Sequence, residues 1–317
     1  PKKFVKNVVK EITAEFLATY PEPQGFIEKY AQFVGVSPET VFPTNGSDRA
    51  IRAILETFGS GEKEVLTVAP SFEMYWVNCK ILGLKHKAVE FNADFSLDVK
   101  KVIAEINENT GIVVLLNPNS PIGYTYNDRQ VESIIEKARK FNALVVIDEA
   151  YHYFYDKTFI DKAKKYDNVL VLRTFSKMFS LASVRLGVII GDKTLIDMLN
   201  KARLTFDVNS VALLFGERIL ERPDVIKRLI SVQKKGKRFL IKQLKSLGYE
   251  CYDCKGNYVL LKPKNPAAAV AQKLKDEKKI LVHGYSGRIL GDYLRVTTGS
   301  VRMMRVFLDG FIDADKA

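Results

Sequence analysis

Hydrophobic and polar positions alternate in blocks along the first two-thirds of the chain. Short, largely apolar, strand-like runs recur between about residues 40 and 190, and segments with helical spacing, such as 128–141, lie between them. Continuous apolar runs are typical of strands that are buried on both faces of a mostly parallel sheet. They predict strands at 65–69, 87–91, 112–116, 144–147, 169–172 and 188–190. Alternating strands and helices indicate a layered α/β domain.

The pattern changes after residue 191. A long helical stretch at about 195–247 is interrupted near Asp207 and Pro223. Short strands are then predicted at 258–261, 280–282 and 293–296, followed by a closing helix at about 301–312. This order predicts a smaller α+β domain. We therefore expect a large domain over residues 20–210 and a small domain over residues 211–317.

Composition excludes several classes of protein. The chain has 317 residues, of which 47% are hydrophobic, so it can form one large or two medium domains. No run of eighteen apolar residues is present, so no membrane span is predicted. Three cysteines are too few for a disulfide framework and indicate a reducing, cytoplasmic setting. Cys251 and Cys254 resemble half of a zinc site, but no second cysteine pair exists and the histidines are scattered, so no metal is expected.

The formal net charge of +12 allows two interpretations. A basic face could follow the phosphates of a nucleic acid, or lysines could simply solvate helix faces, as in 234–238. We favour the second interpretation because no nucleic-acid-binding module is recognisable. A basic surface would still attract a phosphorylated small molecule.

Residues 176–187 carry the most informative chemistry. Lys177 follows the small hydroxyl residue Ser176, Arg185 comes shortly afterwards, and apolar strand-like runs lie on both sides. A lysine between two strands of an α/β core is poorly solvated, so its amine loses a proton more easily and can form a Schiff base. Arginine is suited to bidentate phosphate binding. Together they indicate a cofactor with an aldehyde and a phosphate, which is pyridoxal 5′-phosphate.

This stretch resembles the cofactor-lysine motif of the class I and II aminotransferases, and among them the histidinol-phosphate aminotransferases. The resemblance runs in order through nearly the whole chain, at residues 20–22, 46–48, 70–72, 117–123, 148–151, 176–177, 185 and 294–295. It implies the fold type I architecture of aspartate aminotransferase, with a large α/β/α cofactor domain. The small domain would be completed by the N-terminal segment 1–19, which is expected to be helical near residues 2–18.

The resemblance assigns the catalytic roles. Lys177 would bind the cofactor aldehyde and move protons between the substrate's α-carbon and the cofactor. Asp148 would face the ring nitrogen and keep it protonated, so that the ring accepts electrons. Tyr151 would donate a hydrogen bond to the phenolic oxygen of the cofactor. A turn aspartate is the ordinary alternative for Asp148 at a strand end.

The other cofactor contacts also follow from the resemblance. The phosphate would be held by Ser47 and Asp48 at a helix N-terminus, with Ser176, Arg185 and Thr174. Phe72 matches the aromatic residue that stacks on the ring, with Tyr75 and Trp76 as alternatives. Ser120 stands where the family usually has an asparagine on the phenolic oxygen, so that contact could instead be made by Asn119. The peptide before Pro121 is expected to be cis.

Two partner and substrate assignments complete the expected site. Tyr20 matches a tyrosine that reaches the phosphate of the neighbouring subunit, which implies a homodimer. Arg295 matches the arginine that binds the substrate's carboxylate or phosphate. His283 stands where the histidinol-phosphate enzymes have a further arginine, so a different anionic acceptor is open. Family members usually have a substrate-facing segment resembling Asn-Glu-Asn-Pro ahead of the residues that begin here, and part of the substrate site is expected from it.

We therefore expect a pyridoxal-phosphate-dependent aminotransferase that takes its amino group from L-glutamate and gives it to a small, anionic carbonyl compound. A decarboxylase of the same fold, resembling threonine-phosphate decarboxylase, is the first alternative, because it shares most of these motifs. A non-catalytic, effector-binding regulator is the second alternative. Such regulators carry an extra DNA-binding domain, and none is recognisable within these residues.

Overall fold

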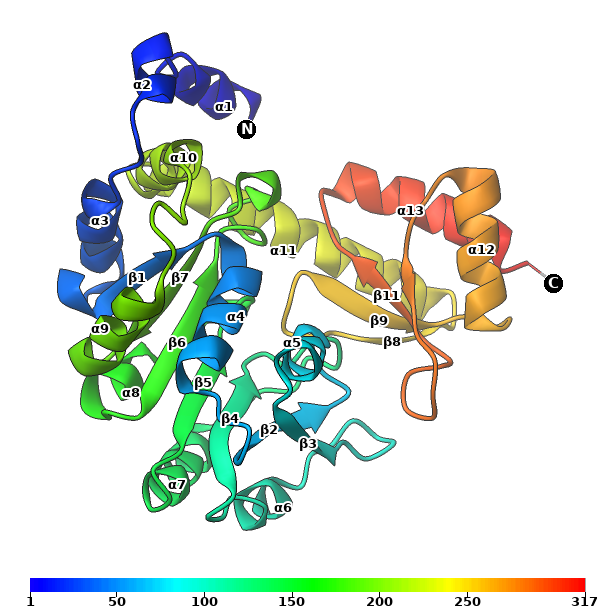
Figure 1. The fold of residues 1–317 in the computed structure, drawn as a ribbon. Coiled ribbons are helices and arrows are strands. Elements are labelled where there is room, and N and C mark those ends of the chain that lie inside the picture. Colours follow the sequence, from blue (N-terminus) through cyan, green and yellow to red (C-terminus); the bar gives the residue numbers. More distant parts are fainter. Residues whose placement is uncertain (317) are drawn as a thin grey trace.

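The computed structural model describes residues 1–316 and contains two sheets (Figure 1). Seven strands form the large sheet in the order β1-β7-β6-β5-β4-β2-β3, and four strands form the small sheet in the order β10-β11-β9-β8. The large-sheet strands are β1 (Val41–Thr44), β2 (Glu64–Ala69), β3 (Lys85–Glu90), β4 (Thr110–Leu116), β5 (Leu144–Asp148), β6 (Val169–Thr174) and β7 (Gly187–Gly191). The small-sheet strands are β8 (Glu250–Tyr252), β9 (Tyr258–Lys262), β10 (His283–Gly284) and β11 (Leu294–Thr297).

Helices cover both sheets. They are α1 (Lys2–Val9), α2 (Ala14–Ala18), α3 (Gln24–Val34), α4 (Gly46–Phe58), α5 (Met74–Leu82), α6 (Val99–Ala104), α7 (Asp128–Arg139), α8 (Ile160–Lys165), α9 (Lys193–Ala202), α10 (Ser210–Leu220), α11 (Pro223–Ser246), α12 (Ala267–Lys278) and α13 (Val301–Ala314). Short 3-10 turns are η1 (Pro38–Thr40), η2 (His152–Phe154) and η3 (Ala182–Val184). None of the helices in residues 1–316 combines the length and the apolar character that a membrane crossing requires.

The large sheet is mostly parallel. Only β7 runs against its neighbours, pairing antiparallel with both β1 and β6. Alternate residues of the central strands enter different cores: Val113 and Val145 pack with α3, α7 and α10, whereas Val114 and Val146 pack with α4, α5 and α9. Burial on both faces explains why these strands are continuously apolar. The result is the expected three-layer α/β/α arrangement.

The small sheet is antiparallel and has its own core. Residues of β9 and β11 pack against α11, α12 and α13, with Leu240, Leu261 and Phe311 fully buried. The predicted strand at 280–282 is wrong. Only the next two residues, His283 and Gly284, form a strand, β10, which pairs with β11. In Figure 1 the long helix α11 runs from the large sheet to the small one.

The N-terminal segment is helical as expected, but it is broken into α1 and α2. It lies beside α10 in Figure 1, where Phe4 contacts Phe215 and Glu11 forms an ion pair with Arg218. Phe4 and Val8 belong to the core beneath the large sheet. The division into residues 20–210 and 211–317 with 1–19 stays a proposal, and these contacts connect 1–19 to α10.

Candidate active site

Most of the predicted site residues lie at one edge of the large sheet. Strands β1, β2, β4, β5 and β6 run in the same direction, so their carboxyl ends share that edge. In open α/β sheets, ligands bind beyond this edge. The segments that leave this edge are, in chain order, Gly46 to Asp48, Pro70 to Phe72, Asn117 to Gly123, Asp148 to Tyr151, and Thr174 to Arg185.

Asp148 is the buried carboxylate of this edge. Its side chain is 4% exposed, and each oxygen accepts one hydrogen bond: Oδ1 from the amide of Ala150 at 3.0 Å and Oδ2 from the hydroxyl of Tyr75 at 3.0 Å. Burial raises the pKa of Asp148 to about 6, although both hydrogen bonds and the charge of Lys177 oppose the rise. A positively charged partner would stabilise a buried carboxylate in this environment, because an unpaired buried charge is costly.

Lys177 and Tyr151 lie on the neighbouring side. The Lys177 amine is 5.6 Å from the centre of the Tyr151 ring. Tyr151 is buried and its hydroxyl accepts a hydrogen bond from Arg295 Nη2 at 2.6 Å. The structure therefore brings Asp148, Lys177, Tyr151 and Arg295 together, although Arg295 belongs to the small sheet.

Arg295 is surrounded by aromatic rings. Its guanidinium carbon is 4.2 Å from the centre of the Tyr258 ring, and Tyr285 also faces it. The buried Nε atom has no hydrogen-bond partner among residues 1–316. A buried N–H donor without a partner is costly, so this atom is suited to receive an anion from a ligand. His283 pairs with Arg295 across β10 and β11, but its side chain is exposed and contacts the Tyr285 ring.

The predicted phosphate residues gather at the start of α4. Arg185 Nη2 donates to Asp48 at 3.1 Å, and Arg185 Nη1 lies 3.4 Å from the hydroxyl of Ser176. The hydroxyl of Thr174 accepts from the Ser176 amide at 3.1 Å. Gly46 has a φ of +78°, and a Cβ atom there would overlap the Arg185 guanidinium. Only glycine allows the chain to turn here with arginine in contact.

The loops on the other side of Asp148 are tied together. Asn119 is fully buried, and its amide accepts from the Ser71 hydroxyl at 2.8 Å and donates to the Pro70 carbonyl at 3.0 Å. Phe72 is 37% exposed at the end of this loop. Ser120 is buried beside the Tyr258 ring, and the Ser120–Pro121 peptide is cis, as expected. The Asn119 amide thus holds the Phe72 loop and has one N–H left over.

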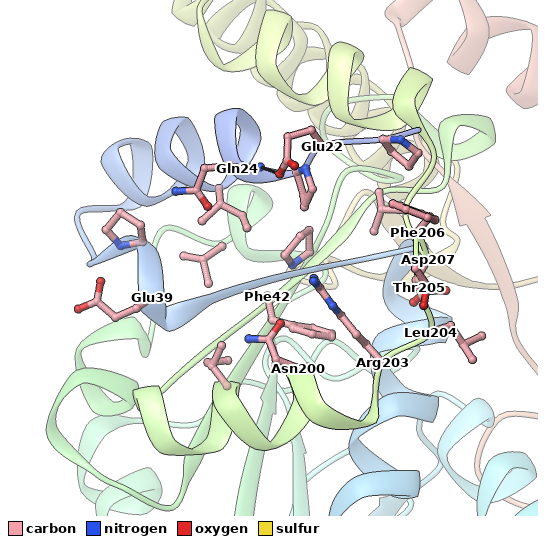
Figure 2. A pocket seen from close by; sticks show the side chains of 18 of the residues that line it. Glu22, Gln24, Glu39, Phe42, Asn200, Arg203, Leu204, Thr205, Phe206 and Asp207 are labelled. Carbon is pink, nitrogen blue, oxygen red and sulfur yellow. Dashed lines mark hydrogen bonds between the residues drawn. The ribbon is translucent and has the colours of Figure 1, made fainter. Parts of the chain in front are cut away.

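Tyr20 lies apart from this group. Its side chain is 74% exposed and stacks on Phe206, with the ring centres 4.3 Å apart. Within one copy of the chain it contributes nothing to the site. Nearby, a cavity of about 700 Å³ lies between α3, β1, α9 and the loop 203–208 (Figure 2). No predicted site residue lines this cavity, so it is not the place where Asp148 and Lys177 meet.

Comparisons with known proteins decide the family. The model of the family "Aminotransferase class I and II" matches residues 3–311. A histidinol-phosphate aminotransferase from Clostridium novyi is 33% identical over 303 residues, which cover 94% of this chain and 84% of that protein. The chain belongs to the class I and II aminotransferases.

Solved structures show that this aminotransferase has the expected fold. The histidinol-phosphate aminotransferase from Sinorhizobium meliloti, in complex with pyridoxal-5′-phosphate, has a TM-score of 0.89 at 19% identity and covers 98% of this chain and 86% of its own. The L-threonine-O-3-phosphate decarboxylase from Porphyromonas gingivalis has a TM-score of 0.81 at 20% identity, covering 98% and 92%. The fold type I prediction is confirmed, but similarity of fold does not separate these two activities.

The predictions of a pyridoxal-phosphate cofactor and of an aminotransferase are confirmed by the family. The residues of this aminotransferase fit that cofactor. The buried Asp148 suits a protonated ring nitrogen, Lys177 suits the aldehyde, and the glycine turn beside Arg185 suits a phosphate. Sequence reasoning missed Tyr258 and Tyr285 around Arg295, and treated Tyr75 only as an alternative stacking residue. In the sequence these tyrosines are marked only by being aromatic and near a motif, and an aromatic residue in such a place is equally typical of the hydrophobic core.

Proposed function

We propose that this aminotransferase transfers the amino group of L-glutamate to a small carbonyl compound that carries an anionic group. Arg295 is the observation that supports this proposal, because its buried Nε has no partner among residues 1–316 and its guanidinium is held between Tyr151 and Tyr258. A fixed guanidinium with a free donor binds a carboxylate or phosphate in one orientation. Histidinol phosphate is the first amino product to test, and the corresponding phosphorylated ketone is the acceptor. The relatives at about one-third identity are named for histidinol phosphate.

In the proposed mechanism the bound cofactor supplies a protonated ring that accepts the electron pair released at the substrate's α-carbon. Asp148 would hold the positive ring nitrogen, since a buried carboxylate is stabilised by a positive partner. The Lys177 amine would take the proton from the substrate's α-carbon and deliver it to the carbon of the cofactor that carries the amino group. The Tyr151 hydroxyl, which accepts a hydrogen bond from Arg295, would donate one to the phenolic oxygen, and Arg295 would bind the substrate's anionic group.

We propose further cofactor contacts by position. Ser47, Asp48, Thr174, Ser176 and Arg185 would hold the phosphate at the N-terminus of α4, where backbone N–H groups and the helix dipole favour an anion. Arg185 would exchange part of its contact with Asp48 for the phosphate. Phe72 would cover one face of the ring, because it is partly exposed and its loop is held by Asn119.

The role of Ser120 is limited by its surroundings. It is buried beside the Tyr258 ring, and the backbone carbonyl of Asn119 accepts from the Tyr258 hydroxyl at 3.2 Å. The Tyr258 hydroxyl therefore fixes the backbone of the 119–121 loop through this hydrogen bond. We propose that Asn119, through its remaining N–H, or Ser120 itself completes the contact to the phenolic oxygen.

We expect the purified protein to show a near-visible absorption band from the cofactor on Lys177, and we expect L-glutamate to abolish that band. Addition of 2-oxoglutarate should restore it, because the half-reactions are reversible in a ping-pong mechanism. L-Histidinol phosphate should act like glutamate if the proposed substrate is right. Release of carbon dioxide from an amino-acid phosphate, with a band that glutamate leaves untouched, would instead support the decarboxylase.

His283 gives a test of specificity. Substitution His283→Arg places a permanent charge opposite Arg295 on the neighbouring strand. We expect kcat/KM for histidinol phosphate to rise by about 10-fold, since an added charge-assisted hydrogen bond contributes about 1.5 kcal/mol. His283→Gln is the matched control and should not raise it. An unchanged kcat/KM in the arginine variant would remove the specificity argument.

We also propose a homodimer in which Tyr20 reaches the site of the neighbouring subunit. Large apolar side chains are exposed around Tyr20, and the exposed fractions are 66% for Leu17, 63% for Leu204 and 52% for Phe206. Exposed apolar clusters of this kind mark interfaces.

Sedimentation equilibrium tests whether the protein is a dimer. If Tyr20 crosses the interface, a mixed dimer of the inactive Tyr20→Ala and Lys177→Ala proteins has one intact site. Random mixing makes about half of the dimers mixed, so about one-quarter of all sites should become active, and no recovery in a proven mixed dimer would contradict the proposal.

A cytoplasmic location stays part of the proposal.

A further inference from the structure

Tyr75 is a buried residue that no assigned role explains. It belongs to the first turn of α5, directly after the Phe72 loop, and its side chain is 3% exposed. Its hydroxyl donates to Asp148 Oδ2 at 3.0 Å. Strand β4 lies between β2, which leads to α5, and β5, which ends in Asp148. Tyr75 therefore reaches Asp148 across a whole strand.

The carboxylate of Asp148 is held from two directions. The Ala150 amide fixes Oδ1, and the Tyr75 hydroxyl fixes Oδ2 from the side of β2. Lys177 acts on it from the side of β6, and Glu149 is the nearby like charge. Tyr75 supplies the only side-chain hydrogen bond to Asp148 among residues 1–316. The orientation of this carboxylate thus depends on one backbone amide and one phenol.

The protonation states agree with this arrangement. Burial and the adjacent carboxylate raise the pKa of Tyr75 well above its usual value, so the phenol stays a donor at every physiological pH. Its hydrogen bond lowers the pKa of Asp148, which burial alone would raise further. A donor that stays neutral favours the ionised carboxylate without adding a charge that would repel a pyridinium ring.

Other buried tyrosines show that this contact is not a general feature of the core. Tyr30 and Tyr126 are at most 1% exposed, and their hydroxyls have no hydrogen-bond partner within residues 1–316. In those positions the ring serves packing. Tyr75 differs because its hydroxyl meets the one buried carboxylate that faces the proposed cofactor site.

We propose that Tyr75 is a positioning residue that keeps the Asp148 carboxylate ionised and aimed at the ring nitrogen of the cofactor. The inference rests on the proposed role of Asp148. It predicts that Tyr75 matters for a cofactor with a ring nitrogen and not for the rest of the cofactor's contacts.

The test compares two probes, pyridoxal phosphate and its 1-deaza analogue, in which carbon replaces the ring nitrogen. Dissociation constants are measured by equilibrium dialysis against the cofactor-free protein. For Tyr75→Phe we expect the Kd of pyridoxal phosphate to rise by about 10-fold at pH 7.5, as for a lost hydrogen bond to a charged group. The Kd of the deaza analogue should change by less than about two-fold. Equal changes for both probes, or no change, would overturn the proposal.

A pH series gives a second readout. In the wild-type protein the preference for pyridoxal phosphate over the deaza analogue should be lost as the pH falls through about 6, because Asp148 then becomes protonated. In Tyr75→Phe the midpoint should move upward by about one unit. A midpoint that stays in place would show that Tyr75 acts only through packing.

Two further variants separate the possible failures. Tyr126→Phe removes a buried hydroxyl without a partner, so it should leave both dissociation constants unchanged. Asp148→Asn should itself abolish the preference. If it does not, the proposed role of Asp148 fails. If it does but Tyr75→Phe has no effect, only the role of Tyr75 fails. Should Tyr75→Phe not fold, the same ratio is measured on Tyr75→Leu, which also removes the donor to Asp148; a ratio equal to that of the wild-type protein would overturn the proposal.

Discussion

Substitution Lys177→Ala is expected to reduce turnover with L-glutamate by at least about 10²- to 10⁴-fold, the usual contribution of one positioned proton-transfer group. Within residues 1–316, no other lysine follows a strand at this edge of the sheet as closely as Lys177, which comes three residues after the end of β6 and faces the Tyr151 ring. Water would have to replace its amine at the α-carbon. Stopped-flow absorbance with saturating glutamate measures the loss.

The control for Lys177 is a lysine on a helix that covers the large sheet outside the proposed site. Lys193 on α9 forms an exposed ion pair with Asp197 at 2.6 Å, and Lys193→Ala should keep the wild-type rate. The Lys177→Ala protein should also lose the near-visible band while it keeps the fold, as measured by circular dichroism. A Lys177→Ala protein with the full rate would contradict the whole assignment of the site.

Substitution Arg173→Met is expected to lower the free energy of unfolding by about 3–5 kcal/mol, because it leaves a buried carboxylate without its partner. Arg173 Nη2 is 2.7 Å from Glu149 Oε2, and the two side chains are 3% and 0% exposed. Glu149 also accepts from the amide of Phe159 and from the hydroxyl of Thr158. Urea denaturation of the cofactor-free protein measures the loss.

An exposed ion pair provides the comparison for Arg173. Lys193→Met breaks a pair whose side chains are 60% and 50% exposed, and pairs of this kind contribute about 0–1 kcal/mol. A loss for Arg173→Met as small as that for Lys193→Met would contradict the prediction and show that the buried Glu149 side chain needs no arginine partner. Glu149 follows Asp148 in the chain, so this ion pair lies directly beside the proposed cofactor carboxylate.

The sequence was sufficient for the central strands of the large sheet because these strands are buried on both faces. Apolar runs marked β2 and β4 to β7 to within a few residues, and β3, which is mostly exposed or half-buried, was found from the shorter run at 87–91. The strands that were missed, β1 and β8, are short, and β8 alternates exposed and half-buried residues without an apolar run. The strand expected at 280–282 shows the reverse error, because an apolar run there ends in a loop and only His283 and Gly284 pair with β11.

The site was predictable wherever a residue follows a strand directly. Asp148, Thr174, Lys177 and the 117–123 loop are all brought together by the common direction of β4, β5 and β6. Contacts between the two sheets left no such signal. The bond from Arg295 to Tyr151 joins residues far apart in the chain, and so does the bond from Tyr75 to Asp148. Only the folded backbone sets those distances, so sequence spacing could not reveal them.

The single antiparallel strand of the large sheet, β7, restricts where the chain can accept insertions and deletions. Thr174 and Gly187 pair directly, and the Phe175 amide bonds the Leu186 carbonyl, so residues 175–186 form a loop closed at its base. Both Lys177 and Arg185 lie inside this loop. A one-residue insertion or deletion there would shift the proposed nucleophile, Lys177, relative to the proposed phosphate anchor, Arg185, because the two ends of the loop are fixed by pairing. Laboratory evolution of this enzyme should therefore yield length variants in the surface connections and almost none between β6 and β7.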